Sequence, residues 1–381
     1  MTKRHAGNRA SPAPPVLAGL LLSAATALAA QAQSPQDGVV QQGQATIRQD
    51  SAQSTISQTS RNAVIDWRGF DVGRDHAVIF DQPGADATTL NRVTGGPGSV
   101  IEGAIRAPGT VVIQNGAGVL FTPTARIDVG GLVATSQQVD TDHLFATGGF
   151  RIGGGEQAGA RVVNEGDITI RQAGLAALVG SDVENAGSIV APLGTVVLAA
   201  GTRTTIDLSG DGMFLVAVGN PEERAVRATQ SGRIDVSGGH VVISAAGAAR
   251  ALDSVVNTSG VIRASSLTGR GGSVRLSSGR GGTTRVGGRV EARGAADGGS
   301  IWVLGKTVNV TTAAAIDASG ARDGGEVRIG GDLRGLGGLL RAEDTTLAWG
   351  SEVRAEGGTG QGGLVVAWAD GRTVFDGTIS T

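Results

Sequence analysis

Five segments in the second half of the chain share one pattern: a short strand of alternating polarity, a turn with two adjacent glycines, and a second alternating strand. They occupy residues 233–245, 261–278, 289–305, 315–331 and 352–369. Their first apolar anchors, at spacings of 28, 28, 26 and 37 residues, are Ile234, Ile262, Val290, Ile316 and Val353. One such repeat cannot bury its apolar face alone, so copies must stack, and the spacing predicts a β-solenoid.

The composition agrees with many short strands joined by tight turns. The 381-residue chain has 64 Gly and only 3% aromatic residues, although 40% of it is hydrophobic. With only 10 Pro and no three-residue glycine period, a collagen-like chain is excluded. No segment has a 3.6-residue apolar period of useful length, so we expect an all-β, parallel β-helix. In its first repeat Ile234 and Val236 should point inward, and Arg233, Asp235 and Ser237 outward.

Residues 1–33 are predicted to be a cleaved signal peptide. A basic start precedes the apolar run VLAGLLLSAATALAA, and small-residue cleavage sites follow Ala29 and Ala32. The run is short for a membrane span. The exported chain has no Cys, so it must manage without disulfides: either its core is large enough, or its export requires an unfolded chain.

In the stretch GTVVIQNGAGVLF, residues 109–121, a short polar segment interrupts an apolar strand. An inward-turned Asn115 can form hydrogen bonds with backbone groups that a solenoid corner leaves unpaired. Gly116 and Gly118 would supply the permissive backbone of that corner. The residue types therefore have a structural explanation that requires no chemistry.

Residues 45–150 contain several further blocks in a fixed order. The first is Ile65-Asp66-Trp67 with Phe70, Val72 and Gly73, and the second joins Phe80, Gln82 and Pro83 to Leu90-Asn91-Arg92-Val93. Ser99, Ile101, Gly103 and Ile105 follow, then the Asn115–Gly118 corner, and then the block 131–136, GLVATS. Together these blocks resemble the N-terminal secretion domain of filamentous haemagglutinin-like exoproteins, the secreted partners of two-partner secretion. Asn115 and Gly118 match the family's Asn-Pro-Asn-Gly corner, whereas Gly116 and Ala117 depart from it.

The resemblance implies a domain organisation and a partner. It implies a secretion domain at residues 34–158 and a shaft of right-handed parallel β-helix at 159–381, with an N-terminal capping region. The implied partner is a dedicated outer-membrane barrel transporter with periplasmic docking domains, so the chain would be secreted, or held on the surface, by a Gram-negative bacterium. The residues that the resemblance assigns to the secretion motif are Trp67, Gln82, Pro83, Asn91, Arg92, Asn115 and Gly118.

Other chemistry finds little support in the sequence. The four His are scattered, no cofactor or metal site is predicted, and a net charge of −2 argues against a nucleic-acid partner. The repeats place Asp235, Arg263, Glu291, Asp317 and Arg354 at equivalent outward positions, which we interpret as a solvated face of mixed charge. Trp302 and Trp368 are expected in the core or at its edge; exposed sugar-stacking platforms are the alternative.

We therefore expect a non-enzymatic, adhesin-like or haemagglutinin-like exoprotein that binds glycans or proteins on host or neighbouring cells. A secreted β-helix enzyme acting on polysaccharide, and a cytolysin or toxin-delivery exoprotein, remain alternatives. The alternating pattern continues to Thr381, so the shaft is expected to be truncated there.

Overall fold

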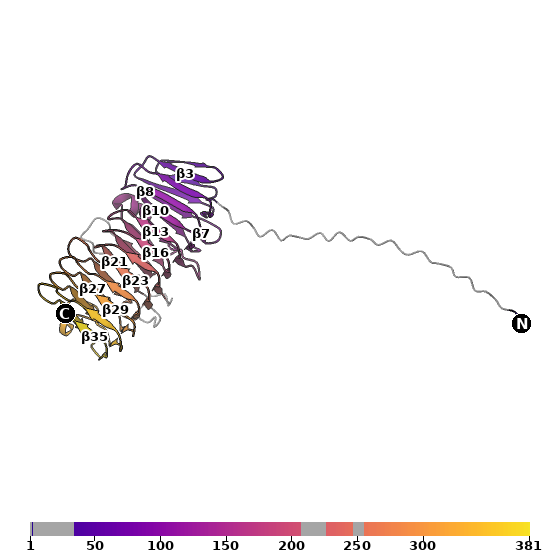
Figure 1. Cartoon of the computed structure of the whole chain (residues 1–381). Coiled ribbons are helices and arrows are strands. Elements are labelled where there is room, and N and C mark those ends of the chain that lie inside the picture. Colours follow the sequence, from indigo (N-terminus) through magenta and orange to yellow (C-terminus); the bar gives the residue numbers. More distant parts are fainter. Residues whose placement is uncertain (1, 3–33, 207–225, 247–254) are drawn as a thin grey trace. The chain divides into compact units, whose positions relative to one another are not determined.

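The computed structural model describes residue 2 and residues 34–206, 226–246 and 255–381. Apart from Thr2, the predicted signal peptide lies outside the described residues. Within Ala32–Thr381 the described strands stack along one axis in sequence order, as Figure 1 shows. The parallel β-helix predicted from the repeats is confirmed.

Each coil of the helix runs through three faces, which we call A, B and C. Face A contains β3 (Gln53–Gln58), β5 (Ala77–Asp81), β13 (Asp167–Ile170), β16 (Ser188–Val190), β20 (Arg233–Asp235), β23 (Val261–Arg263), β26 (Arg289–Glu291), β29 (Ala315–Asp317), β32 (Glu352–Arg354) and β35 (Thr378–Ser380). Face B contains β4 (Asn62–Trp67), β6 (Thr88–Val93), β14 (Leu175–Gly180), β17 (Thr195–Gly201), β21 (His240–Ala246), β24 (Ser273–Ser277), β27 (Ser300–Leu304), β30 (Glu326–Ile329) and β33 (Leu364–Ala367). The long strands β8 (Ala104–Asn115) and β10 (Arg126–Thr135) continue from face A into face B.

Face C is a separate parallel sheet, with ten strands among the described residues. Its members are β7 (Ser99–Ile101), β9 (Val119–Phe121), β12 (Val162–Asn164), β15 (Asp182–Asn185), β19 (Arg227–Gln230), β22 (Val255–Thr258), β25 (Thr283–Val286), β28 (Thr307–Val310), β31 (Asp344–Leu347) and β34 (Arg372–Phe375). A short 3₁₀ turn, η1 (Leu333–Gly335), lies between β30 and β31.

The core runs along the inside of the three faces, and the repeat anchors form one of its rows. Ile234 pairs in register with Ile262, and the row continues through the three later anchors to Val353. All five anchors are fully buried. Stacking identical positions lets each coil cover the apolar residues of the previous one, as the sequence spacing predicted.

The N-terminal end of the solenoid is capped by antiparallel strands. β1 (Val39–Gln42) pairs with β4, and β2 (Ala45–Gln49) pairs with β3. Gly38 lies directly against the indole of Trp67, since a Cβ at this glycine would be 2.4 Å from the ring. This antiparallel pairing confirms the predicted capping region.

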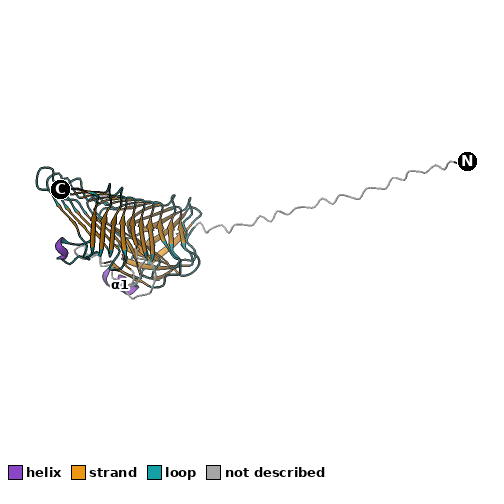
Figure 2. Cartoon of the chain, turned by 90° about the horizontal axis from the view of Figure 1, so that it is seen from below, coloured by secondary structure: helices purple, strands orange, loops and turns teal. Residues whose placement is uncertain are grey.

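A second apolar layer, which the sequence analysis did not predict, covers the outside of face B. It consists of the helix α1 (Thr141–Thr147), β11 (Phe150–Gly153) and β18 (Arg203–Ile206), which we call the outer cover. β11 and β18 pair antiparallel in a sheet of their own. Figure 2 shows α1 outside the stacked strands. The first coils of face B are consequently buried on both sides.

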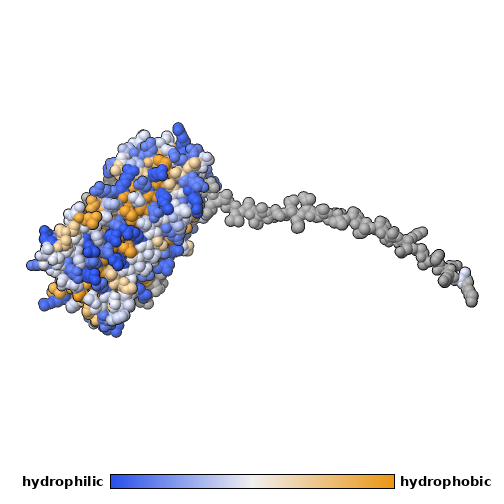
Figure 3. All heavy atoms as spheres, in the orientation of Figure 1, coloured by the Kyte–Doolittle hydropathy of each residue, from blue (hydrophilic) through white to orange (hydrophobic). Residues whose placement is uncertain are grey.

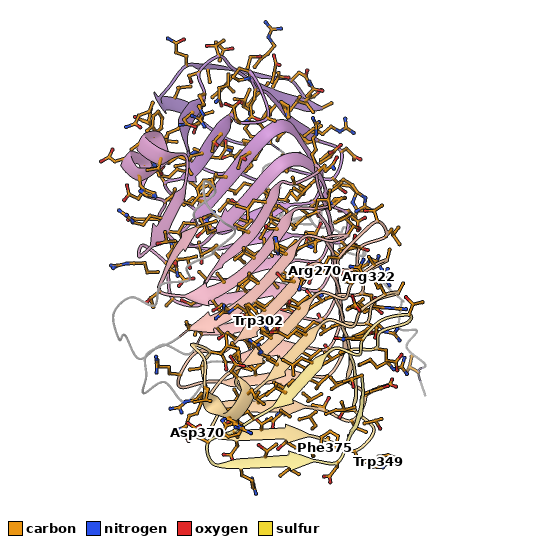
Figure 4. All side chains as sticks on the ribbon, turned by 90° about the vertical axis from the view of Figure 1, so that its left-hand side faces the viewer. Arg270, Trp302, Arg322, Trp349, Asp370 and Phe375 are labelled. Carbon is orange, nitrogen blue, oxygen red and sulfur yellow. The ribbon has the colours of Figure 1, made fainter. Side chains whose placement is uncertain are left out.

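Two expectations about side chains are corrected by the structure. Asp235 faces outward but is only 8% exposed, because Arg233 and Arg263 lie across its carboxylate. Trp302 is not in the core: it projects outward from β27, where Arg275 lies 5.4 Å from its ring centroid and Glu326 accepts a hydrogen bond from its Nε1. Its position on the outer surface is visible in Figure 4.

The other two prominent indoles differ from each other. Trp368 is half-buried beside Gly331 and donates a 3.3 Å hydrogen bond to Asp370, which agrees with the predicted edge packing. Trp349 is 77% exposed in the turn that follows β31. Figure 4 places Trp349 at the C-terminal end of the solenoid.

Candidate functional site

The predicted motif residues lie in the first coils of the solenoid, at three separate places. The first place is the interior of face B, where Trp67 and Asn91 meet. Trp67 Nε1 donates a 3.0 Å hydrogen bond to Asn91 Oδ1, and Asn91 Nδ2 donates one of 3.1 Å to the carbonyl of Val112. Trp67 also packs edge-on against Phe70, with ring centroids 5.5 Å apart. Two fully buried polar side chains thus connect β4, β6 and β8.

Arg92 follows Asn91 but points to the opposite side of β6. Its guanidinium forms a bidentate ion pair with Asp66 of the adjacent strand, at 2.6 and 3.0 Å. The side chains are 34% and 20% exposed, so water screens the pair only in part. Asp66 belongs to the same motif block as Trp67, and the pair fixes the register of β4 on β6 from outside.

The second place is the corner between faces A and B, where Gln82 is buried. Gln82 Nε2 donates hydrogen bonds to Thr89 Oγ1 (2.8 Å) and to the carbonyl of Thr110 (3.1 Å), and its Oε1 accepts one from the Gly109 amide (2.9 Å). Thr89 in turn donates to Gln58 Oε1. This chain of polar side chains satisfies backbone groups at the corner in successive coils. Pro83, the next residue, is exposed at the tip of the turn.

The third place is the corner between faces B and C, where Asn115 ends β8. Its Nδ2 donates hydrogen bonds of 3.0 Å to both the carbonyl of Pro97 and Ser99 Oγ, and its Oδ1 accepts one from the Ala117 amide. Asn115 is fully buried, so the structural prediction for this residue is confirmed. The side chain joins the corner of its own coil to the preceding coil.

The two glycines of this corner are needed for different reasons. Gly118 has a φ of 109°, and a Cβ there would be 2.5 Å from the carbonyl oxygen of Arg161. Gly116 does not have a positive φ, but a Cβ on it would lie 2.8 Å from the carbonyl oxygen of Gly155. The expectation that both supply an unusual backbone holds only for Gly118, since Gly116 is required for close approach.

The three places do not form one surface patch. Trp67, Gln82, Asn91, Asn115 and Gly118 are buried, Arg92 is half-buried, and only Pro83 is freely exposed. Their chemistry is hydrogen bonding between coils rather than catalysis. Gln58 and Thr89, which complete the contacts, were not among the predicted residues, whereas Asp66 and Ser99 belong to the predicted blocks but were not assigned to the secretion motif. The sequence signal for Gln58 and Thr89 is a polar side chain at an inward position of an alternating strand.

The outward charged row of face A has the register that the repeats predicted. Asp235, Arg263, Glu291, Asp317 and Arg354 are direct neighbours on successive strands. Arg263 Nε lies 3.0 Å from Glu291, and this hydrogen bond raises the pKa of the Arg263 guanidinium above its usual range. A β-helix glycosidase needs a carboxylic acid held protonated beside a second carboxylate. Each carboxylate of this row instead lies in an ion pair with a neighbouring arginine.

Within residues 34–206, 226–246 and 255–381, no group of three or more His, Asp or Glu is placed to hold a metal ion. No helix in the same ranges is long and apolar enough to cross a membrane. The surface that Figure 3 presents is mainly hydrophilic, with scattered apolar patches.

Comparison with known proteins gives consistent results. The family model of the TPS secretion domain matches residues 30–292. A heme/hemopexin-binding protein of Haemophilus influenzae is 32% identical over 248 residues, which are 64% of this chain and 27% of that protein. A second heme/hemopexin-binding protein of Haemophilus influenzae is 28% identical over 257 residues, 62% of this chain and again 27% of the relative. The chain thus spans about a quarter of the length of the curated relatives it matches.

The solved structure of the HMW1 secretion domain from Haemophilus influenzae superposes with a TM-score of 0.80 at 26% identity. The alignment covers 91% of this chain and 99% of that domain. The capped parallel β-helix therefore recurs in a known secretion domain. The chain belongs to the TPS secretion domain family, the N-terminal domains of two-partner secretion exoproteins.

Proposed function

We propose that this chain is the secretion module and first shaft coils of an exoprotein that a dedicated outer-membrane barrel transporter recognises in an extended state. The match of the TPS secretion domain model to residues 30–292 carries the proposal. After residues 1–33 are removed, the chain crosses the periplasm unfolded and passes through the barrel. Its β-helix then folds outside the cell.

The burial of the motif residues supports recognition before folding. Trp67, Asn91 and Asn115 are inaccessible in the folded solenoid, so a transporter domain reaches them only while the chain is extended. An extended segment of alternating polarity can add as a strand to the edge of a docking domain's sheet, with side chains filling pockets on alternate positions. After export, the same side chains form the hydrogen bonds between coils.

Folding outside the cell suits the architecture of the chain. Each coil contacts mainly the coil before and the coil after it, so folding can propagate by adding one coil at a time. The chain has no Cys, and therefore no disulfide can form in the periplasm and block passage through the barrel.

For the whole exoprotein we propose binding rather than catalysis. Adhesion to glycans or proteins of host or neighbouring cells is one function, and heme or hemopexin binding is the second, which the names of the curated relatives favour. The paired charges of face A weigh against the polysaccharide-degrading alternative. No residue in the described parts of the chain specifically supports the toxin-delivery alternative.

The test of export is to express the full chain in a Gram-negative host with and without its neighbouring transporter gene, and to quantify the protein in the medium and on the cell surface. We expect the mature chain outside only when the transporter is present. Equal amounts outside the cell in both strains would contradict the proposal. The secreted protein is then assayed for binding to immobilised hemopexin and to host-cell monolayers, which separates the two binding functions.

A further inference from the structure

The outer side of face B is apolar over the first coils, where a solvated β-helix would carry polar residues. The outward positions stack in register along β4, β6, β8, β10, β14 and β17. They are occupied by Val64, Leu90, Val112, Val133, Ala177 and Val197, and each of these is buried. We call them the outer row. An apolar surface of this length requires a cover, because it would favour association with other chains if it were exposed.

The outer cover is assembled from two segments that are distant in the sequence. Leu144 of α1 and Phe150 and Ile152 of β11 come from the excursion after β10, whereas Ile206 of β18 comes from the excursion after β17. All four are buried against the outer row. Antiparallel pairing joins the segments, with Phe150 opposite Ile206 and Ile152 opposite Thr204.

Polar contacts fasten the cover to several coils at once. Gln114 Oε1 of β8 accepts a 3.0 Å hydrogen bond from the Val139 amide, and Gln137 Nε2 donates to the carbonyl of Gly201 at the end of β17. Glu156 accepts hydrogen bonds from the side chains of Ser136 and Ser181. The cover can be complete only after β17 has stacked on β14.

We propose that the β11–β18 pairing, which we call the clasp, commits the chain to export. It forms only when residue 206 has reached the outside of the cell. This proposal rests on the proposed function, with the N-terminal coils leaving the barrel first. Before closure the outer row is half covered and the first coils can reopen. After closure, pulling any of these coils back into the barrel requires the clasp and its apolar layer to open together.

The coupling within the clasp is tested on the full secreted chain, purified and examined by hydrogen exchange with mass spectrometry. Ile206→Ala should raise the exchange rate of residues 139–153 about a hundredfold, the factor that corresponds to the usual cost of truncating a fully buried Ile. The matched control is Ile234→Ala, because Ile234 is equally buried but lies on face A in the next coil. It should leave residues 139–153 as in the wild type. Unchanged exchange of residues 139–153 in Ile206→Ala would overturn the clasp.

The role in export is tested with the transporter present, by a pulse-chase measurement of how fast residues 34–206 become protected from protease added outside the cell. Phe150→Ala and Ile206→Ala should slow this step at least about threefold, whereas Ile234→Ala should not. An equal slowing by all three variants refutes the commitment role but leaves transporter-dependent export intact. Wild-type export without the transporter would instead refute the proposed function.

Discussion

Asn115→Ala is the substitution whose effect follows most directly from the geometry of the motif. It removes three hydrogen bonds: two donated by Nδ2, to the Pro97 carbonyl and Ser99 Oγ, and one accepted by Oδ1 from the Ala117 amide. Pro97 is exposed and Ala117 is half-exposed, so water can replace the partner that each of them loses. Ser99 is buried and stays unpaired.

The expected cost is therefore about 2 kcal/mol, that of one unsatisfied buried hydroxyl with a small packing loss, rather than three times that amount. The equilibrium constant for local opening of the corner should therefore rise about 30-fold. Hydrogen exchange of the full secreted chain measures this directly in the peptides covering residues 97–121. The amount of chain in the medium, at unchanged synthesis, should fall in parallel.

Asn309→Ala is the matched control, since it makes the same chemical change at a half-exposed outward position of face C. It should change neither exchange in residues 97–121 nor secretion. The reasoning is refuted if Asn115→Ala leaves the exchange of the corner at the wild-type rate. If the corner loosens while secretion stays at the wild-type level, the residue serves the fold and has no part in export.

Three further predictions concern the same region. Asn91→Ala should lower the free energy of unfolding by about 2–3 kcal/mol, because the buried Trp67 Nε1 loses its acceptor. In a double-mutant cycle with Trp67→Phe, the two losses should fall short of additivity by about 1 kcal/mol, and strict additivity would contradict the contact. Gly118→Ala should destabilise the face B–C corner by more than about 1 kcal/mol, because Gly118 has a φ of 109° and lies close to Arg161. Urea denaturation monitored in the N-terminal coils measures this loss, and unchanged stability would contradict the proposed strain. Burial raises the pKa of Asp71, so the folded state keeps this proton to higher pH than the unfolded state does, and stability should fall as the pH rises from below the usual Asp range through the raised pKa. Asp71→Asn should keep the hydrogen bond from the Val100 amide and remove this fall, and a wild-type-like pH profile in the variant would disprove the assignment.

Pairing between coils could be predicted because it follows from spacing alone. Ile234 and Ile262 are equivalent positions of successive repeats, and stacking repeats brings equivalent positions into register. The corner role of Asn115 could also be predicted, since an inward polar side chain followed by Gly116 and Gly118 needs backbone partners nearby in the fold. Both predictions depend only on residues that are adjacent in the sequence or separated by one repeat.

The outer cover was decided by the tertiary structure. Alternation specifies which side of a strand is apolar, but β14 is apolar at almost every position, and such a run does not reveal what lies against its second side. The answer is a pairing between β11 and β18, which lie outside the repeat pattern and have no periodic relation to it. In the same way, alternation correctly placed Asp235 on the outer side of its strand, but its burial depends on Arg263 from a neighbouring coil. The outward position of Trp302 beside Arg275 was not predicted. The sequence by itself determined the stacking of the coils, because stacking repeats one local rule; the tertiary structure decided what covers the outside of the coils, because that depends on contacts made only once.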